Sequence, residues 1–361
     1  KVFIMDNLKY LPFKDINLND TFFDSLKSDY SHGFIAWFNK KANDPSEKAY
    51  VLYEETGNID GFLYLKIESG SVDDIEPPIK NGLHLKIGTF KFSPKGTLRG
   101  QRFLKKIFDN ALSYKVDDIY VTIFKKHSYL INLFKMYGFN ECAIKNSENG
   151  EEIVLLKDMA LHSSTGDILF DYPRFPFTDN QNKYILSIYP EFHSILFPDS
   201  ILHTESPDIL QDVSHTNSIR KVYICGMSKV AEIKPYDIII IYRTSDNKGS
   251  AYYRSVATSI CIVENVKSIF DFPSEEIFID YCIKYSVFTK EKLSELYRSK
   301  KYPYIITFTY NLALPKRLNR AALINNVGLD ENAYWGILQI SNDQFSRIIN
   351  QSETDEDIII N

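Results

Sequence analysis

Residues 95–104 read Lys-Gly-Thr-Leu-Arg-Gly-Gln-Arg-Phe-Leu and stand between a strand-like run and an amphipathic helical run. A helix N-terminus exposes unpaired backbone N–H groups and the positive end of its dipole, so amides there can hold an anion. The stretch also carries Lys95, Arg99 and Arg102, and cations at a helix start oppose the dipole. A bound phosphate or pyrophosphate would offset that conflict, so we expect an anion site here.

The segments on either side of this stretch have clear patterns of their own. In the preceding run, Leu85 and Ile87 share one face, whereas Phe90 and Phe92 fall on the other. Because the change occurs at Gly88, the sequence predicts a β-bulge there. A helical stripe follows over 103–112, then a buried strand over 118–124, and a short helix over 130–137 with Gly138 as its C-terminal cap.

This order of a bulged strand, a basic glycine loop, a helix, a strand and a short helix ending in Gly-Phe resembles the GNAT family of N-acetyltransferases. The resemblance covers about residues 1–158. The family's acetyl-CoA loop runs Arg/Gln-x-x-Gly-x-Gly/Ala, followed by Leu-Leu on the helix. Here Lys95 stands where Arg or Gln belongs, Leu98 replaces the first Gly, and Gly100 keeps the second. Phe103 and Leu104 match the Leu-Leu pair.

The resemblance implies acetyl-CoA as the cofactor. Backbone amides of residues 96–102 would hold its pyrophosphate, with Gly100 allowing a close approach, and the bulged strand would offer backbone groups to the pantetheine arm. The alternative is a basic surface helix after an ordinary turn, and no metal site is expected. The expected cofactor-binding residues are Phe90, Lys91, Phe92, Lys95, Gly96, Thr97, Leu98, Arg99, Gly100, Gln101, Arg102 and His127.

Three residues are candidates for catalysis. Family members often carry Leu-Tyr before Gly-Phe, and that Tyr protonates the departing thiolate, but here Phe134 takes its place. Tyr137 is either a substitute acid or a packing residue. His127 stands where the family usually has Asn, and it either relays protons or is a hydrogen-bonded loop residue. Glu68 is either a general base acting through water or an exposed acid at a strand end. Transfer can also run mainly on positioning and on a backbone amide that stabilises the oxyanion.

Composition limits the class of protein. The chain has 361 residues, 44% of them hydrophobic, and a formal net charge of −5, which confines any nucleic-acid site to a local patch. Its 4 scattered cysteines argue against a disulfide frame or a structural zinc site. The chain has no apolar run long enough for a membrane span, and its first residues lack the apolar core of a signal peptide. We therefore expect a soluble, cytoplasmic protein.

The expected fold class is mixed α+β, with a GNAT fold followed by a β-barrel. We expect the first domain over 1–160, a linker over 161–180, a mainly β domain over 181–350 and an acidic, frayed tail over 351–361. In the second domain, Ser274 and Thr289 are expected to cap two helices, and Ser341 with Gln344 fits a capping box on a third.

The second domain resembles the PUA-like group of small β-barrels, which includes the ASCH and EVE domains, over about residues 181–350. The group's recurring Lys-Pro-Gly-Asp turn into a buried strand appears as Lys234-Pro235-Tyr236-Asp237, with Tyr236 in place of the Gly. Such barrels commonly bind RNA or modified nucleotides, and the resemblance implies no more than that.

Basic and aromatic residues of this domain allow such a role. Arg220, Lys221, Arg243 and Arg254 are expected to contact phosphates, and Trp335 to stack on a base. The alternative is that these are solvated strand charges and core aromatics. Because side chains alternate along a strand, Tyr242 and Arg243 should lie on opposite faces.

The sequence favours an acetyl-CoA-dependent N-acetyltransferase that acts on a primary amine. An RNA-linked amine such as aminoacyl-tRNA, the substrate of toxin-type members of the family, is the attractive acceptor. One alternative is a protein or small-amine acceptor with the barrel as a regulatory module. The other is a non-catalytic sensor of CoA or nucleic acid. The expected partners are RNA (tRNA) at the second domain and a protein partner or antitoxin encoded separately.

Overall fold

The computed structural model describes residues 8–54, 56–93, 99–160, 163–197, 218–246 and 248–360. The chain divides into two compact units, Lys1–Leu161 and His162–Asn361. Both units combine a sheet with helices, so the fold class is mixed α+β, as expected. Among the described helices, none is long and apolar enough to cross a membrane.

A seven-stranded sheet forms the first unit, in the order β1-β2-β3-β4-β5-β7-β6. Neighbouring strands are antiparallel except β4 and β5, which are parallel. The strands are β1 (Leu8–Pro12), β2 (Lys48–Tyr53), β3 (Ile59–Val72), β4 (Ile79–Phe92), β5 (Asp118–Ile123), β6 (Asn140–Ser147) and β7 (Gly150–Asp158). The helices are α1 (Asp24–Asp29), α2 (Phe34–Ala42), α3 (Arg99–Tyr114) and α4 (Ser128–Met136).

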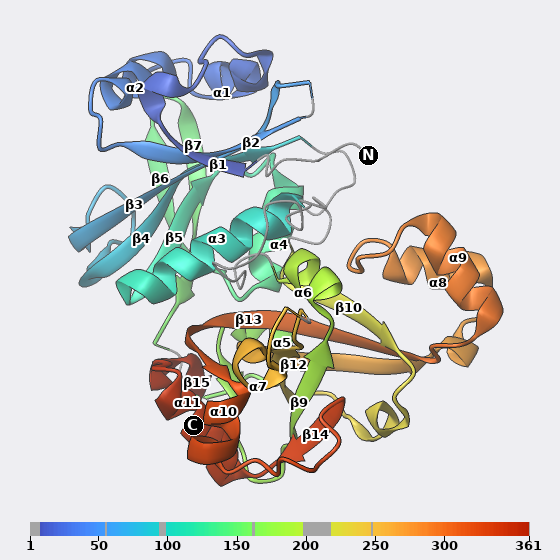
Figure 1. Ribbon diagram of the computed structural model, residues 1–361. Helices are drawn as coiled ribbons and strands as arrows, with labels where there is room; N and C mark the ends of the chain where they lie inside the picture. Colours follow the sequence, from blue (N-terminus) through green and yellow to red (C-terminus); the bar gives the residue numbers. More distant parts are fainter. Residues whose placement is uncertain are drawn as a thin grey trace. The chain divides into compact units, whose positions relative to one another are not determined.

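Helices cover both faces of this sheet (Figure 1). Helices α1 and α2 lie on one face, where Phe34 and Phe38 pack in one cluster with Phe62 of β3. Helix α3 lies on the other face, and its Phe103 meets Phe90 of β4 edge-on, with 5.7 Å between ring centroids. Burying one such side chain stabilises a fold by roughly 1.5–3 kcal/mol, so these contacts hold the helices on the sheet.

The bulge expected in β4 is present. The register between β3 and β4 includes Ile87 and Thr89 but skips Gly88. A Cβ atom on Gly88 would lie 2.6 Å from Cδ1 of Tyr64, so glycine is required by this close approach. Strands β3 and β4 form a long hairpin, whose pairing reaches Val72 and Ile79 at the turn.

A six-stranded sheet forms the second unit, in the order β10-β13-β12-β11-β9-β14. The hydroxyl of Tyr223 on β10 donates to the carbonyl of Ser187 on β9 at 3.3 Å, which brings the edge strand β10 back toward β9, as in a barrel. The strands are β9 (Lys183–Ile188), β10 (Arg220–Cys225), β11 (Ile238–Arg243), β12 (Val256–Ser268), β13 (Tyr304–Asn319) and β14 (Ile337–Ile340), with a separate pair β8 (Phe175–Pro176) and β15 (Ile359–Ile360). The helices are α5 (Ile168–Asp171), α6 (Pro190–Leu196), α7 (Ala251–Arg254), α8 (Glu275–Cys282), α9 (Lys290–Ser299), α10 (Arg320–Ala322) and α11 (Asn342–Gln351).

The segments expected to form a linker and a frayed tail both contain regular structure. Residues 163–180 contain α5 and β8 and belong to the second unit. Residues 352–360 contain a 3-10 helix, Glu356–Ile358, and β15, which pairs with β8. Ile358 and Ile360 are 2% and 3% exposed. The acidic residues of this segment suggested a frayed end, but the isoleucines that follow them are buried and hold the segment on the second unit.

The turn Lys234-Pro235-Tyr236-Asp237 leads into β11. The N–H of Asp237 donates to the carbonyl of Lys234 at 3.1 Å, and Tyr236 has a φ of 73°. Proline at the second position and a positive φ at the third fit a type II turn, which prefers glycine at that third position. Tyr236 adopts the positive-φ backbone conformation that glycine usually takes at this position, and its hydroxyl donates to the carbonyl of Gly166.

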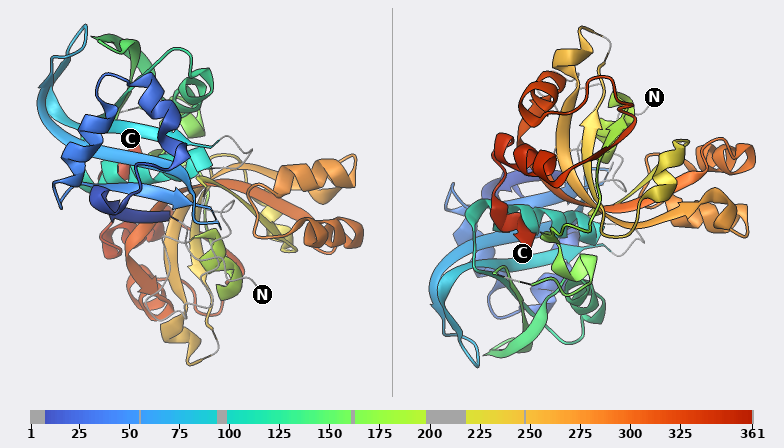
Figure 2. Two further views of the ribbon diagram at one scale, coloured as in Figure 1. Left: turned by 90° about the horizontal axis from the view of Figure 1, so that it is seen from above. Right: turned by 90° about the horizontal axis from the view of Figure 1, so that it is seen from below.

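Helix starts in the second unit follow the sequence closely. Ser274 and Thr289 cap α8 and α9, and Ser341 with Gln344 forms the capping box of α11, as expected. Residues 252–254 belong to α7, where the Ser250 side chain caps the helical turn by accepting from the N–H of Tyr252. Figure 2 shows α8 and α9 side by side beyond the ends of β12 and β13.

Candidate active site

Strands β4 and β5 part in the middle of the first sheet. Their parallel pairing ends at Ile87 and Val121. Strand β4 nevertheless continues to Phe92, paired with β3 on its other side. Beyond the bulge, the edge of β4 that faces β5 is not paired with that strand in the part of the chain that the structure describes. Backbone N–H and C=O groups without a strand partner need water or a ligand, so this edge can bind an extended molecule.

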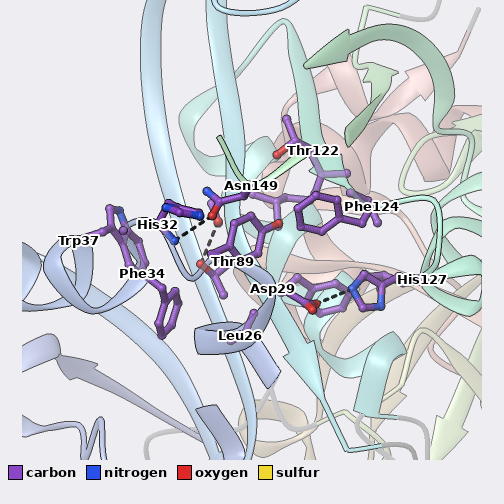
Figure 3. Close-up of a pocket in the computed structure, with 18 residues that line it drawn as sticks. Leu26, Asp29, His32, Phe34, Trp37, Thr89, Thr122, Phe124, His127 and Asn149 are labelled. Atoms are coloured by element: carbon purple, nitrogen blue, oxygen red, sulfur yellow. Dashed lines mark hydrogen bonds and ion pairs between the residues drawn. The ribbon is translucent and has the colours of Figure 1, made fainter. Parts of the chain in front are cut away.

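A cavity of about 360 Å³ opens where the two strands part (Figure 3). Its walls come from the α1–α2 segment, the bulged part of β4, the end of β5 and the start of α4. The aromatic residues that line it are Tyr30, Phe34, Trp37, Phe90 and Phe124. The polar residues that line it include Asp29, His32, Thr89, His127 and Asn149. Its size falls near the lower end of small-ligand pockets.

His127 and Asp29 form an ion-pair geometry on one side of this cavity (Figure 3). His127 immediately precedes α4 and Asp29 ends α1, and the His127 Nε2 lies 3.0 Å from the Asp29 Oδ2. Lys126 Nζ contacts the other carboxylate oxygen at 2.5 Å. The Asp29 side chain is 13% exposed and that of His127 is 44% exposed. Burial raises the pKa of Asp29, but hydrogen bonds from Lys126 and His127 outweigh burial and hold the pKa below its ordinary value.

The charged Asp29 carboxylate fixes the chemistry of the His127 ring. A carboxylate accepts hydrogen bonds, so it favours the proton on Nε2 and leaves Nδ1 as the basic nitrogen. A histidine held in this way can accept a proton from an ammonium group and return it later. Sequence reasoning found His127 but missed Asp29, because the two residues lie 98 positions apart and only the fold brings them together.

A second polar contact lies on a different side of the cavity. The backbone N–H of His32 donates to Oδ1 of Asn149 at 3.0 Å, and Figure 3 shows this pair away from Asp29 and His127. The Tyr30 hydroxyl donates to Oε1 of Glu152 at 2.7 Å. Burial and the charge of Glu152 raise the pKa of Tyr30, so its phenol stays protonated.

Glu68 and Tyr137, two of the three catalytic candidates, do not line the cavity. Glu68 accepts from the Tyr120 hydroxyl at 2.5 Å and from Lys66 at 2.8 Å. Burial raises its pKa, but these hydrogen bonds outweigh burial and lower it, which makes Glu68 a weak base. Tyr137 is fully buried with its ring 6.2 Å from that of Phe108, so it is a core residue.

Phe134, at the place of the family's acidic Tyr, also belongs to the core. Its ring centroid lies 5.4 Å from that of Phe90 and 4.8 Å from that of Phe139, and the side chain is fully buried. Phe134 therefore offers the cavity no hydroxyl.

The start of α3 carries the second half of the expected anion loop. Lys95, Gly96, Thr97 and Leu98 lie outside the described residues, and the backbone of α3 begins at Arg99. A Cβ atom on Gly100 would lie 2.8 Å from Cδ2 of Leu133 and 2.9 Å from Cζ of Phe92. Close packing of the helix start on its neighbours is thus a reason for glycine here that the sequence did not reveal.

The other expected cofactor residues have varied surroundings. Lys91 Nζ donates to Ser25 Oγ at 2.6 Å and to the carbonyl of Phe22, so it joins β4 to α1 and to the segment before α1. Burial lowers the pKa of Lys91. Gln101 and Arg102 are buried, with exposed fractions of 9% and 5%. The start of α3 therefore does not present the Arg102 charge on an open surface.

The first unit fits acetyl-CoA at two points. The open edge of β4 supplies backbone groups for an extended arm. In the described part of the chain, Gln101 Oε1 is buried with no hydrogen-bond donor, which suits a ligand that carries amide N–H groups, as pantetheine does.

The predicted nucleic-acid contacts do not form an open basic patch. Arg220 is paired with Glu264 at 2.9 Å, and Arg254 with Asp246 at 2.5 Å. The remaining three residues are buried, with exposed fractions of 1% for Lys221, 3% for Arg243 and 7% for Trp335. The Trp335 ring packs on Tyr242 at 5.2 Å and beneath Arg320 at 4.1 Å. These basic and aromatic side chains are thus buried or paired within the second unit. The sequence pattern alone could not distinguish that arrangement from an exposed site.

Comparison with known proteins gives matches among solved structures only. No family model matches the chain, and no curated protein sequence is similar to it. The chain is similar to a putative phosphinothricin N-acetyltransferase, with 15% identity and a TM-score of 0.32, over 42% of this chain and 96% of that one. It is similar to the IAA acetyltransferase from Bacillus cereus, with 14% identity and a TM-score of 0.31, over 42% and 97%. It is also similar to a mutant of the ZmASCH protein from Zymomonas mobilis, with 7% identity and a TM-score of 0.32, over 48% and 99%.

Proposed function

We propose that the protein is an acetyl-CoA-dependent N-acetyltransferase that acts on a primary amine in the cavity of the first unit. The observation that carries the proposal is the parting of β4 and β5 at the Gly88 bulge, with the Asp29–His127 pair at the opening. When bound, acetyl-CoA supplies an acetyl group activated as a thioester. The open edge of β4, the start of α3 and Gln101 would hold it.

The residues of the cavity have distinct roles in this proposal. A primary amine is an ammonium ion at neutral pH, and it must lose a proton before it can attack a carbonyl carbon. Nδ1 of His127 accepts that proton, and the Asp29 carboxylate stabilises the resulting imidazolium. The aromatic walls, Tyr30, Phe34, Trp37 and Phe124, exclude the water that would otherwise compete with the amine.

The same histidine can replace the missing tyrosine. Phe134 has no proton to give, so the departing thiolate needs another acid. Once His127 has taken the first proton from the ammonium, its imidazolium is an acid at the same cavity and can give that proton to the departing thiolate. The nitrogen loses its second proton to water as the neutral amide forms. One residue then acts first as base and later as acid.

The acceptor is proposed only as a primary amine. An RNA-linked amine was the attractive acceptor on the sequence, but the five residues expected to hold RNA are buried or paired with carboxylates. A protein or small amine fits the cavity without requiring those residues.

The proposal is tested by measuring acetyl-CoA binding and thiol release with a panel of amines: polyamines, amino-terminal peptides and charged tRNA. We expect His127→Ala to lower kcat/KM by about 100-fold or more, as for loss of a general base. Asp29→Asn should lower it by about tenfold, as for loss of an orienting partner. The matched control is Lys125→Gln, because Lys125 is 66% exposed and pairs with Glu151.

The outcomes distinguish an enzyme from a sensor and test the role of His127. Turnover that depends on His127 and Asp29, with Lys125→Gln unchanged, supports the proposal. Acetyl-CoA binding without turnover of any amine would overturn it in favour of the sensor. Full activity in His127→Ala would overturn the assigned role of that residue.

A further inference from the structure

The walls of the first unit's cavity contain two pairs of aromatic rings. The ring centroids of Phe34 and Trp37 lie 5.6 Å apart, and those of Tyr30 and Phe124 lie 5.1 Å apart. Figure 3 shows Phe34 and Trp37 together, apart from Phe124. Trp37 and Phe124 are half-buried, so their rings keep surface that a ligand can cover. The aliphatic side chains that also line the cavity are Leu26, Ile87, Val121, Ile123 and Leu130.

Polar groups of these walls already have partners inside the protein. The Tyr30 hydroxyl donates to Glu152 at 2.7 Å, and Oδ1 of Asn149 accepts from the backbone N–H of His32 at 3.0 Å. Because these groups are engaged, the walls offer a ligand mainly the surfaces of rings and aliphatic side chains.

Charge is concentrated at one end of the cavity. Among the lining residues that the structure describes, Asp29 is the only carboxylate, and none is a lysine or an arginine. An ammonium group is attracted to Asp29, whereas a carboxylate on the ligand would be repelled by it. A second ammonium group against the apolar walls would lose its hydration with no carboxylate to offset the loss. The cavity therefore suits a single positive charge carried by an apolar body.

The position of the cavity leaves room for this body beside the cofactor. Its helical walls come from residues 26–37 and from the start of α4, and α1 and α2 cover one face of the sheet while α3 covers the other. An acceptor can thus enter from the side of α1 and α2, which leaves the start of α3 to acetyl-CoA. The volume of about 360 Å³ is that of a site for a small molecule.

We propose that the acceptor is an arylalkylamine, a primary amine on a short alkyl chain that ends in an aromatic ring. The ammonium lies at Asp29 and His127, and the ring packs against Trp37 and Phe124. This inference rests on the proposed acetyltransferase activity. In the transfer, the amine nitrogen bonds to the acetyl carbon as the carbon–sulfur bond breaks. The first ammonium proton passes through His127 to the thiolate, and the second passes to water.

The test compares phenethylamine with propylamine, phenylalanine and cadaverine as acceptors for the full-length chain. Propylamine lacks the ring, phenylalanine adds a carboxylate beside the amine, and cadaverine carries a second ammonium in place of the ring. We expect kcat/KM for phenethylamine to exceed that for each of the others by about tenfold or more, since burial of an aromatic ring contributes at least that much.

Variants of the walls supply a second readout. Trp37→Leu and Phe124→Leu keep an apolar side chain but remove the ring. Each should lower the ratio of kcat/KM for phenethylamine to that for propylamine by about threefold to tenfold, which is the contribution of one aromatic pair. A partial loss of folded protein leaves this ratio unchanged. The matched control is Ile35→Ala, because Ile35 lies on α2, is 52% exposed and is not part of the cavity lining.

Several results would overturn the inference and leave the acetyltransferase intact. These are equal kcat/KM for phenethylamine and propylamine, a higher value for cadaverine or phenylalanine, or acetylation of a peptide or charged tRNA without acetylation of phenethylamine. A ratio that neither wall variant changes would also overturn it. If no amine of any class is acetylated, the proposed function fails. Calorimetric titration then decides the inference, because equal binding of phenethylamine and propylamine would show that the rings do not hold the amine.

Discussion

At the scale of the residue, Tyr236 shows a conformational cost that the chain tolerates. Its φ of 73° is unfavourable for a residue with a Cβ atom by roughly 1–2 kcal/mol. We expect Tyr236→Gly to be more stable than Tyr236→Ala by about 1 kcal/mol, since both lose the hydroxyl contact but only glycine removes the strain. Urea unfolding of the two variants measures the difference. Equal midpoints would show that the backbone at this turn is not strained.

Asp29 permits a prediction about pH at the same scale. Its pKa is lowered in the folded protein, so its ion pairs add stability above the ordinary pKa of about 3.9 and lose that contribution as the pH falls further. We expect Asp29→Asn to be less stable than the wild type at pH 7, with the difference shrinking below about pH 4. Urea midpoints at pH 7, 5 and 3 test this. A difference that stays constant over that range would contradict the assigned ion pairs.

At the scale of the element, the start of α3 is set by packing. Gly100→Ala should destabilise the first unit by about 1–3 kcal/mol, because the new methyl group meets Leu133 and Phe92. Adding Leu133→Ala should recover part of that loss, so the double variant is more stable than the sum of the two single changes by about 0.5 kcal/mol or more. Unfolding free energies of the four proteins form the test. Strict additivity would mean that the two residues are not in contact.

Elements that depend on local chemistry could be predicted from the sequence. The bulge at Gly88 and the caps of α8, α9 and α11 follow from side-chain parity and from short-range hydrogen bonds. The strand β15 could not be predicted, since its stability comes from pairing with β8, far away in the sequence.

The candidate site divides in the same way. His127 was recognisable from its place after a strand, whereas its partner Asp29 depends on the fold, which brings the end of α1 to the residue before α4. The hydrogen bonds that Lys66 and Tyr120 donate to Glu68 could not be predicted, because a strand-end carboxylate does not reveal its neighbours in the sequence.

At the scale of the whole molecule, two compact units predict two separable transitions. Ile360→Asn should lower the free energy of unfolding of the second unit by about 2 kcal/mol or more, because it buries an amide in the apolar contact of β15. Acetyl-CoA should raise only the unfolding temperature of the first unit. Ile359→Asn is the control, since its side chain is less buried in the same strand. Scanning calorimetry measures the transitions. A single transition that shifts both with Ile360→Asn and with acetyl-CoA would contradict this prediction.

The placement of the tryptophans has an optical consequence. The chain has 2 tryptophans, Trp37 in the wall of the first unit's cavity and Trp335 between Tyr242 and Arg320 in the second unit. Each unit therefore carries its own intrinsic fluorophore. With Trp335→Phe, emission reports the first unit alone, and with Trp37→Phe it reports the second. Ligand entry in one half of the chain becomes visible as quenching or a spectral shift, without any attached label.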